Sequence, residues 1–129
     1  MVSFKRPANS YKVRSSRPLA GKRLVVIEDE PIIKLGLEEV LQNAGATVAR
    51  AFDQKIDAAI LDVNLGNGVT VAAIAERLRE RLVPFLFYSG QSETYLSHLR
   101  KKFPATPFIG KPATHSRIVD EVAGLWPTK

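Results

Sequence analysis

Short apolar runs alternate along the chain with longer segments in which apolar residues recur every three or four positions. The runs predict five strands, at residues 24–27, 47–52, 58–62, 85–88 and 107–110. The longer segments predict four helices, at residues 31–44, 71–82, 93–102 and 116–126. Because continuous apolar runs are typical of strands buried on both faces, the sheet is expected to be parallel. The pattern therefore predicts an α/β fold with right-handed crossovers and helices on both faces of the sheet.

The link between the second and third strands is unusually short. Only about six residues, 52–57, are left there, and a helical crossover needs about ten or more. We expect the helix at this position to be shortened or absent, while six extended residues still reach about 20 Å. That loss predicts an exposed apolar strip of sheet. We hypothesise that the strip is covered by a second copy of the chain or by four N-terminal apolar residues, namely Phe4, Tyr11, Val13 and Leu19.

Composition narrows the class of protein. The 129 residues suit one domain, and no apolar run reaches the roughly 18 residues of a membrane span. The chain has no cysteine, which excludes disulfides, thiolate zinc sites and iron–sulfur clusters. No secretory leader opens the sequence. We therefore expect a cytoplasmic protein with no membrane partner.

Basic charge is concentrated at the N-terminus. Residues 1–23 hold seven of the 19 basic residues and none of the 13 acids, so residues 24–129 carry 12 basic residues against 13 acids. The polar residues and prolines of residues 1–21 predict a flexible basic arm, followed by a folded domain at 22–126 and a tail at 127–129. No nucleic-acid recognition motif accompanies the arm, so we do not expect a nucleic-acid partner.

Residues with functional chemistry follow the predicted strands. Glu28 and Asp29 follow the first strand, Asp62 ends the third, Ser89 follows the fourth and Lys111 follows the fifth. Each has an ordinary structural explanation when taken alone, such as a helix cap, a turn or a surface lysine. In open α/β sheets, however, ligands bind beyond the carboxyl ends of the strands. These five residues are therefore expected to form one site.

Three converging carboxylates would repel one another, and a hard divalent cation offsets that repulsion near neutral pH. Because cysteine is absent and His98 and His115 are not clustered, the available metal ligands are oxygen atoms. Mg²⁺ prefers oxygen ligands. A carboxylate can attack phosphorus to give an aspartyl phosphate. Lys111 and Ser89 would then supply a positive charge and a hydrogen bond to the phosphoryl oxygens.

The sequence resembles the receiver domain of two-component response regulators. Four blocks carry the resemblance in the family's order, over about residues 22–126: Val26–Pro31, Ala59–Leu65, Phe87–Gly90 and Phe108–Pro112. The resemblance implies a flavodoxin-like doubly wound sheet of five parallel strands in the order 2-1-3-4-5. It also implies a single-domain regulator that acts by docking to another protein.

The resemblance implies roles for the acidic residues. Asp62 would be the phosphoacceptor. Asp29 would bind Mg²⁺ directly, Glu28 would bind it directly or through water, and Asn64 would contribute its backbone carbonyl. The phosphoryl donor would be a sensor histidine kinase or a phosphotransfer protein, and the downstream partner is a protein that the sequence does not identify.

The resemblance also implies roles for the switching residues. Lys111 would contact the phosphoryl group, and Ser89 would turn towards it after phosphorylation. Phe108 would be the aromatic rotamer switch, without the hydroxyl of a tyrosine. Pro112 would follow Lys111 through a cis peptide bond. A homodimer through the region of the missing helix is a further expectation.

Two other functions are weighed against this one. A phosphatase of the haloacid-dehalogenase type needs a second aspartate two residues beyond the nucleophile, where this chain has Asn64, and an amide cannot act as the general acid. We therefore do not expect an enzyme beyond self-phosphorylation and autodephosphorylation. The remaining alternative is a degenerate receiver that binds partners independently of phosphorylation.

Overall fold

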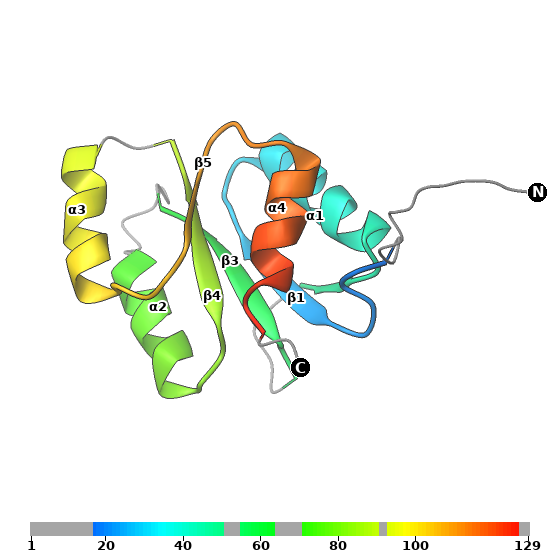
Figure 1. Cartoon of the computed structure of the whole chain (residues 1–129), viewed down its shortest axis with the longest axis horizontal. Coiled ribbons are helices and arrows are strands. Elements are labelled where there is room, and N and C mark those ends of the chain that lie inside the picture. The colour runs from blue at the N-terminus through cyan, green and yellow to red at the C-terminus, as the bar shows by residue number, and fades with distance from the viewer. Residues whose placement is uncertain (1–16, 51–54, 64–70, 91–92, 127–129) are drawn as a thin grey trace, which may run out of the picture.

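The computed structural model describes residues 17–50, 55–63, 71–90 and 93–126. A five-stranded parallel sheet with the order β2-β1-β3-β4-β5 forms its centre (Figure 1). The strands are β1 (Arg23–Ile27), β2 (Thr47–Ala49), β3 (Ala58–Asp62), β4 (Phe85–Ser89) and β5 (Phe108–Gly110). The helices are α1 (Pro31–Asn43), α2 (Val71–Glu80), α3 (Glu93–Lys102) and α4 (His115–Ala123). The predicted fold class and strand order are confirmed.

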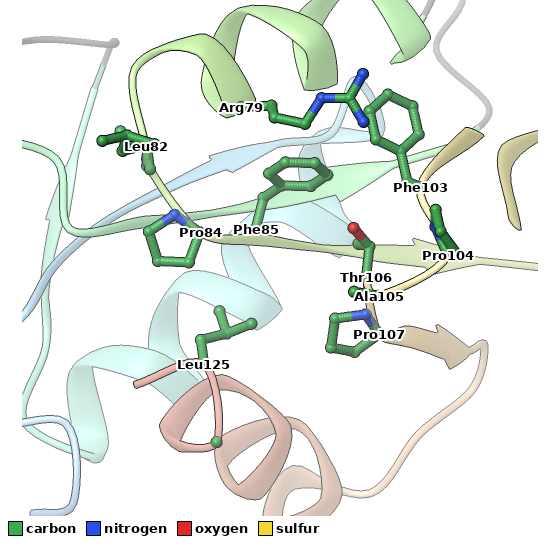
Figure 2. Close-up of a pocket in the computed structure, with 12 residues that line it drawn as sticks. Arg79, Leu82, Pro84, Phe85, Phe103, Pro104, Ala105, Thr106, Pro107 and Leu125 are labelled. Carbon is green, nitrogen blue, oxygen red and sulfur yellow. The ribbon is translucent and has the colours of Figure 1, made fainter. Parts of the chain in front are cut away.

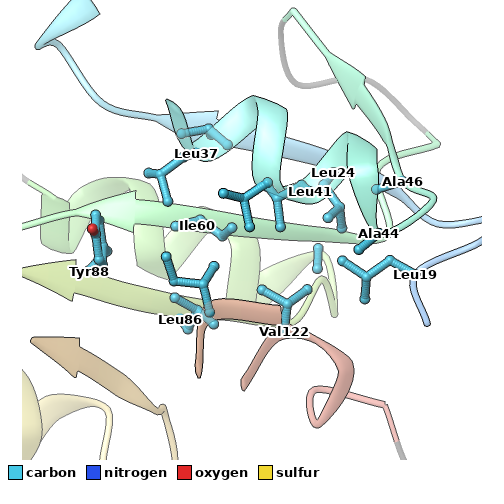
Figure 3. Close-up of a cluster of buried hydrophobic side chains, with 14 of the residues drawn as sticks. Leu19, Leu24, Leu37, Leu41, Ala44, Ala46, Ile60, Leu86, Tyr88 and Val122 are labelled. Atoms are coloured by element: carbon cyan, nitrogen blue, oxygen red, sulfur yellow. The ribbon is translucent and has the colours of Figure 1, made fainter. Parts of the chain in front are cut away.

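Two layers of helices cover the two faces of the sheet (Figure 1). Helices α1 and α4 lie on one face, and α2 and α3 lie on the other. Strand β4 contributes to both cores because its side chains alternate: Leu86 packs on the side of α1 and α4, while Phe85 and Phe87 pack on the side of α2 and α3. Figure 3 shows the first of these cores, with Leu41, Ile60 and Leu86 between helix and sheet.

The segment just before β1 is part of this first core. Leu19 is fully buried beside Leu41 and Ala44, and its backbone N–H donates to the Ala44 carbonyl at 2.8 Å (Figure 3). Gly45 makes the close approach feasible, because its φ is +107° and an added Cβ would lie 2.9 Å from the Ala20 nitrogen. Leu19 therefore packs on the opposite face of the sheet from the one we predicted. The other predicted arm contacts lie outside the described residues.

The connection from β2 to β3 contains no helix in its described part, residues 50 and 55–57. The strip of sheet beside it is nevertheless buried: Val25 and Ala49 are 1% and 5% exposed, and Ile56 of the connection packs in the same cluster. Paired hydrogen bonds hold the connection to β1, since Arg23 and Asp57 each donate a backbone N–H to the other at 2.7 Å. The predicted exposed strip is therefore wrong for these residues, and the homodimer through this region stays a prediction.

Three helices differ in their bounds from the prediction, since α1 ends at Asn43, α2 ends at Glu80 and α4 spans His115–Ala123. α4 begins at His115, one residue early, because the Thr114 hydroxyl caps it by accepting the Arg117 N–H at 3.1 Å. On α1, Ile33 is 36% exposed, and Ile32 and Leu35 are still more exposed. Within the described ranges, no helix is long and apolar enough to cross a membrane.

Candidate functional site

The register of the sheet brings the carboxyl ends of its central strands to one edge. Ile27, the last residue of β1, pairs with Leu61, and Asp62 pairs with Tyr88 on β4. Ser89 pairs in turn with Gly110, the last residue of β5. Residues that immediately follow these strands are therefore neighbours in space although they lie far apart in the sequence.

Lys111 lies between two buried carboxylates. Its ammonium nitrogen is 3.1 Å from Glu28 Oε1 and 3.2 Å from Asp62 Oδ1. The Glu28 and Asp62 side chains are 1% and 4% exposed, whereas the Lys111 side chain is 22% exposed. The lysine therefore lies on the solvent side of two carboxylates that are almost fully buried.

The pKa of two groups in the site is displaced. Burial raises the pKa of Glu28, and hydrogen bonds from the Glu30 N–H and from Lys111 only partly counter it, while Asp62 raises it further. Burial lowers the pKa of Lys111, but its hydrogen bonds to the two carboxylates outweigh that effect and the pKa is raised. The site thus keeps the lysine charged and makes a second buried negative charge unfavourable.

The carboxylates form a group suited to a cation. Glu28, Asp29 and Asp62 each offer an oxygen, and these atoms all lie within 4.8 Å of one another. Asp29 is exposed, so the group opens to solvent on one side. Oxygen donors close together, with room for water on the open side, fit Mg²⁺. Asn64, whose carbonyl the resemblance added to this set, lies outside the described residues.

Local structure explains how Glu28 is held in place. Glu28 Oε2 accepts the backbone N–H of Glu30 at 3.0 Å, at the residue that precedes α1. Glu30 occupies the N-cap position of α1, but its side chain makes no capping hydrogen bond, and Pro31 fills the first helical position. The buried carboxylate of Glu28 therefore satisfies a backbone donor near the helix start, which fixes its direction.

Three further residues that the resemblance singled out, Ser89, Phe108 and Pro112, lie at the end of β4, at the start of β5 and shortly after β5. Ser89 is 4% exposed at the end of β4, and its carbonyl accepts the Lys111 backbone N–H at 2.9 Å. The peptide bond between Lys111 and Pro112 is cis. Phe108 is half-buried at the start of β5, with its ring centroid 4.7 Å from that of Phe87. The Arg100 guanidinium lies 4.5 Å from the centroid of the Phe108 ring, on the side of α3.

Sequence reasoning missed Tyr88. Its ring centroid lies 5.1 Å from the Lys111 ammonium nitrogen, and burial raises the pKa of its hydroxyl. The residue precedes Ser89 in an apolar run, so the sequence identifies it only as part of the core. The contact arises because β5 returns beside β4 and brings Lys111 over the tyrosine ring.

Many solved structures have a similar fold. A response regulator receiver protein from Sinorhizobium medicae is similar over 83% of this chain and 95% of its own, with 21% identity and a TM-score of 0.70. The chemotaxis protein CheY4 from Vibrio cholerae is similar over 83% of this chain and all of its own, with 21% identity and a TM-score of 0.68. No family model and no curated protein matches the sequence.

A third structure shows the same fold within a longer protein. The response regulator PhyR from Brucella abortus matches 84% of this chain with 25% identity and a TM-score of 0.64, but the match covers only 48% of PhyR. Together with the strand order and the positions of the helices, these similarities define the class. The chain has the fold of a response regulator receiver domain.

Proposed function

We propose that the protein is a phosphoacceptor response regulator, with Asp62 as the residue that receives the phosphoryl group. The donor is a phosphohistidine of a sensor histidine kinase or a phosphotransfer protein. A carboxylate oxygen of Asp62 attacks phosphorus, an O–P bond forms and the N–P bond of the donor breaks. The imidazole leaves with the bonding electron pair: a ring already protonated on its other nitrogen leaves as neutral imidazole, and an unprotonated ring takes up a proton from water as it leaves.

One observation carries this proposal. Glu28 and Asp62 are buried together and share the ammonium group of Lys111, at 3.1 Å and 3.2 Å. Phosphoryl transfer depends mainly on neutralising the phosphoryl oxygens and on positioning the reactants, and a fixed lysine beside the nucleophile supplies both. A buried carboxylate pair with a charged lysine is otherwise a poor way to stabilise a fold.

Mg²⁺ would be held by Glu28, Asp29 and Asp62, with the Asn64 carbonyl, and would neutralise negative charge on the phosphoryl oxygens. Ser89 would turn towards the phosphoryl group and Phe108 would change rotamer, which would alter the surface of the protein. The altered surface would then bind another protein. A chain without cysteine suits the reducing cytoplasm, where we place the protein.

The test is incubation with acetyl phosphate and MgCl₂, followed by intact-mass measurement. We expect the mass to increase by one phosphoryl group, and the increase to be reversed by hydroxylamine and prevented by EDTA. The increase should be absent in Asp62→Asn and normal in Asp120→Asn, an exposed aspartate of α4. Labelling that persists in Asp62→Asn would refute the assignment. No labelling of the folded wild-type protein would favour a phosphorylation-independent interaction module.

A further inference from the structure

Tyr88 lies in the same row of the sheet as the candidate phosphoacceptor. Asp62 on β3 pairs with Tyr88 on β4, which pairs in turn with Ile109 on β5. Paired residues on neighbouring strands point to the same face of a sheet, and Tyr88 and Ile109 belong to the core on the side of α1 and α4. Figure 3 shows Tyr88 at one end of that core. The sheet itself therefore fixes the tyrosine beside Asp62.

The ring of Tyr88 lies beneath the ammonium group of Lys111. The distance from the nitrogen to the ring centroid is 5.1 Å, within the roughly 6 Å over which the face of an aromatic ring attracts a cation. Tyr88 is only 8% exposed, and this attraction is stronger where water is excluded. Lys111 has a flexible side chain that is 22% exposed, so the buried ring gives it a fixed contact.

Packing alone does not require an aromatic residue here. Among the buried residues that the structure describes in this core, Tyr88 alone is aromatic, and the others are alanine, valine, leucine and isoleucine. The preceding row of the same core, for example, consists of Val26, Ile60 and Leu86. An aliphatic side chain has no negative ring face to offer a cation. The aromatic residue thus occurs where the core meets the ammonium group.

The ring differs from the carboxylates in what else can bind it. A cation and a phosphoryl group on Asp62 would engage the oxygens of Glu28 and Asp62 that Lys111 now contacts. Mg²⁺ prefers oxygen ligands, and an uncharged ring does not compete for it. The attraction between the ring and the ammonium group therefore persists when the carboxylate oxygens are occupied.

We propose that Tyr88 is a positioning residue for phosphoryl transfer: the face of its ring keeps the Lys111 ammonium group beside Asp62 while a cation and the phosphoryl group occupy the carboxylate oxygens. This inference rests on the proposed function, because Tyr88 acts through Lys111. The ring face makes the contact and the hydroxyl does not, so phenylalanine at this position serves equally well.

The first test measures the contact in the metal-free protein. NMR of protein with ¹⁵N-labelled lysine, recorded in EDTA, detects the ammonium group of Lys111, whose signal is assigned by its absence in Lys111→Met. A ring shields nuclei that lie over its face. We therefore expect an upfield-shifted signal in the wild-type protein and in Tyr88→Phe, and an ordinary lysine position in Tyr88→Leu. An unshifted signal in the wild-type protein would overturn the proposal.

The second test weakens the attraction of the ring without removing the ring. Trifluorophenylalanine at position 88 has nearly the size of phenylalanine, but its fluorine atoms withdraw electron density from the ring face. Relative to Tyr88→Phe, it should weaken binding of beryllofluoride, a phosphoryl mimic, about fivefold in MgCl₂, as measured by calorimetry. The difference should vanish in the Lys111→Met background. The same fluorination at Phe85, on the opposite face of β4, should leave binding unchanged.

The outcomes separate this inference from the proposed function. No beryllofluoride binding by the wild-type protein would overturn the proposed function, and the role of Tyr88 with it. Binding that fluorination at position 88 leaves unchanged would overturn only the role of Tyr88. A loss of the same size in the Lys111→Met background, or after fluorination at Phe85, would also overturn it, because the ring would then act through packing.

Discussion

The ammonium nitrogen of Lys111 lies 3.2 Å from Oδ1 of Asp62, although 48 residues separate the two in the chain. The same nitrogen lies 3.1 Å from Glu28 Oε1. The single positive charge of Lys111 thus faces two carboxylates that are buried from water. A cation bound by these carboxylates would compete with the lysine for the same oxygen atoms, and this competition leads to the first two predictions.

Mg²⁺ should stabilise the folded protein. A ligand that binds only the folded state at ten times its Kd adds about 1.4 kcal/mol to the free energy of unfolding. We therefore expect the Tm to rise by several degrees in MgCl₂ relative to EDTA, as measured by calorimetry. The rise should be absent in Asp62→Ala and retained in Asp120→Ala. An equal rise in all three proteins would mean that Mg²⁺ acts elsewhere.

Lys111→Met should bind Mg²⁺ several-fold more tightly than the wild-type protein, because the competing ammonium group is gone while the carboxylates remain. Isothermal titration calorimetry measures the change. Lys102→Met is the matched control, since Lys102 pairs with Glu76 at 3.6 Å on the surface. The Lys111 variant should also be phosphorylated by acetyl phosphate, yet show smaller changes in its amide NMR spectrum. Weaker Mg²⁺ binding in Lys111→Met would contradict the competition.

Glu28 should make the stability of the metal-free protein depend on pH. Its pKa is raised in the folded state, so the folded protein holds this proton more tightly than the unfolded chain. The free energy of unfolding should therefore fall as the pH rises from about 4.5, the ordinary value, through the folded pKa. In Glu28→Gln this component is missing. We expect urea unfolding in EDTA at several pH values to show that the free energy of unfolding of the variant increases relative to that of the wild-type protein as the pH rises.

Leu82→Gly should stabilise the fold. Leu82 has a φ of +60° and is 89% exposed. Glycine adopts the left-handed backbone conformation without strain, and this gain exceeds the cost of the greater entropy of glycine in the unfolded chain. We expect the free energy of unfolding to rise by about 0.5–1 kcal/mol. Leu82→Ala keeps a Cβ and should show no such gain. Urea unfolding of both variants separates backbone strain from loss of the exposed side chain. A Leu82→Gly protein less stable than Leu82→Ala would show that the conformation is not strained.

Gly45→Ala should destabilise the protein more than Gly21→Ala does. Both glycines have positive φ, at +107° and +82°, so both substitutions cost about 1 kcal/mol or more in backbone strain. At Gly45 an added Cβ would also lie 2.9 Å from the Ala20 nitrogen, whereas nothing lies within 4 Å of one added at Gly21. Equal losses in thermal unfolding would show that the segment before β1 moves aside without penalty.

An apolar groove lined by Leu82, Pro84, Phe85 and Phe103 lies where β4 and β5 begin (Figure 2), at the opposite end of the strands from the candidate phosphoacceptor site. A set of aromatic rings extends between them: Phe108 packs on Phe87 at 4.7 Å, and Phe87 contacts Phe85 and Phe103 at 5.6 Å and 5.8 Å. Phe85 and Phe103 form part of the groove wall. The aromatic layer that supports Phe108 therefore extends to the groove at the other end of the strands.

Much of the fold could be predicted from local sequence. Continuous apolar runs such as the one at 58–61 identify buried parallel strands, and Pro31 marks the helix start that the structure has. The short link at 52–57 predicted a crossover without a full helix, and its described part contains none. The sequence did not predict that the sheet beside this link is buried. Val25 and Ala49 are covered there because Ile56, a residue of the link, packs in the same cluster.

The sequence by itself determined which chemical groups end the strands and, through the rule that parallel strands present their carboxyl ends at one edge, that these groups share a site. Only the tertiary structure decided that Lys111 bridges Glu28 and Asp62, that Tyr88 lies beneath the lysine, and that Leu82 borders an apolar groove. The physical reason is that periodicity is a property of neighbours in the chain. Distances between side chains depend instead on strand register, on helix ends and on packing between segments that the sequence keeps far apart.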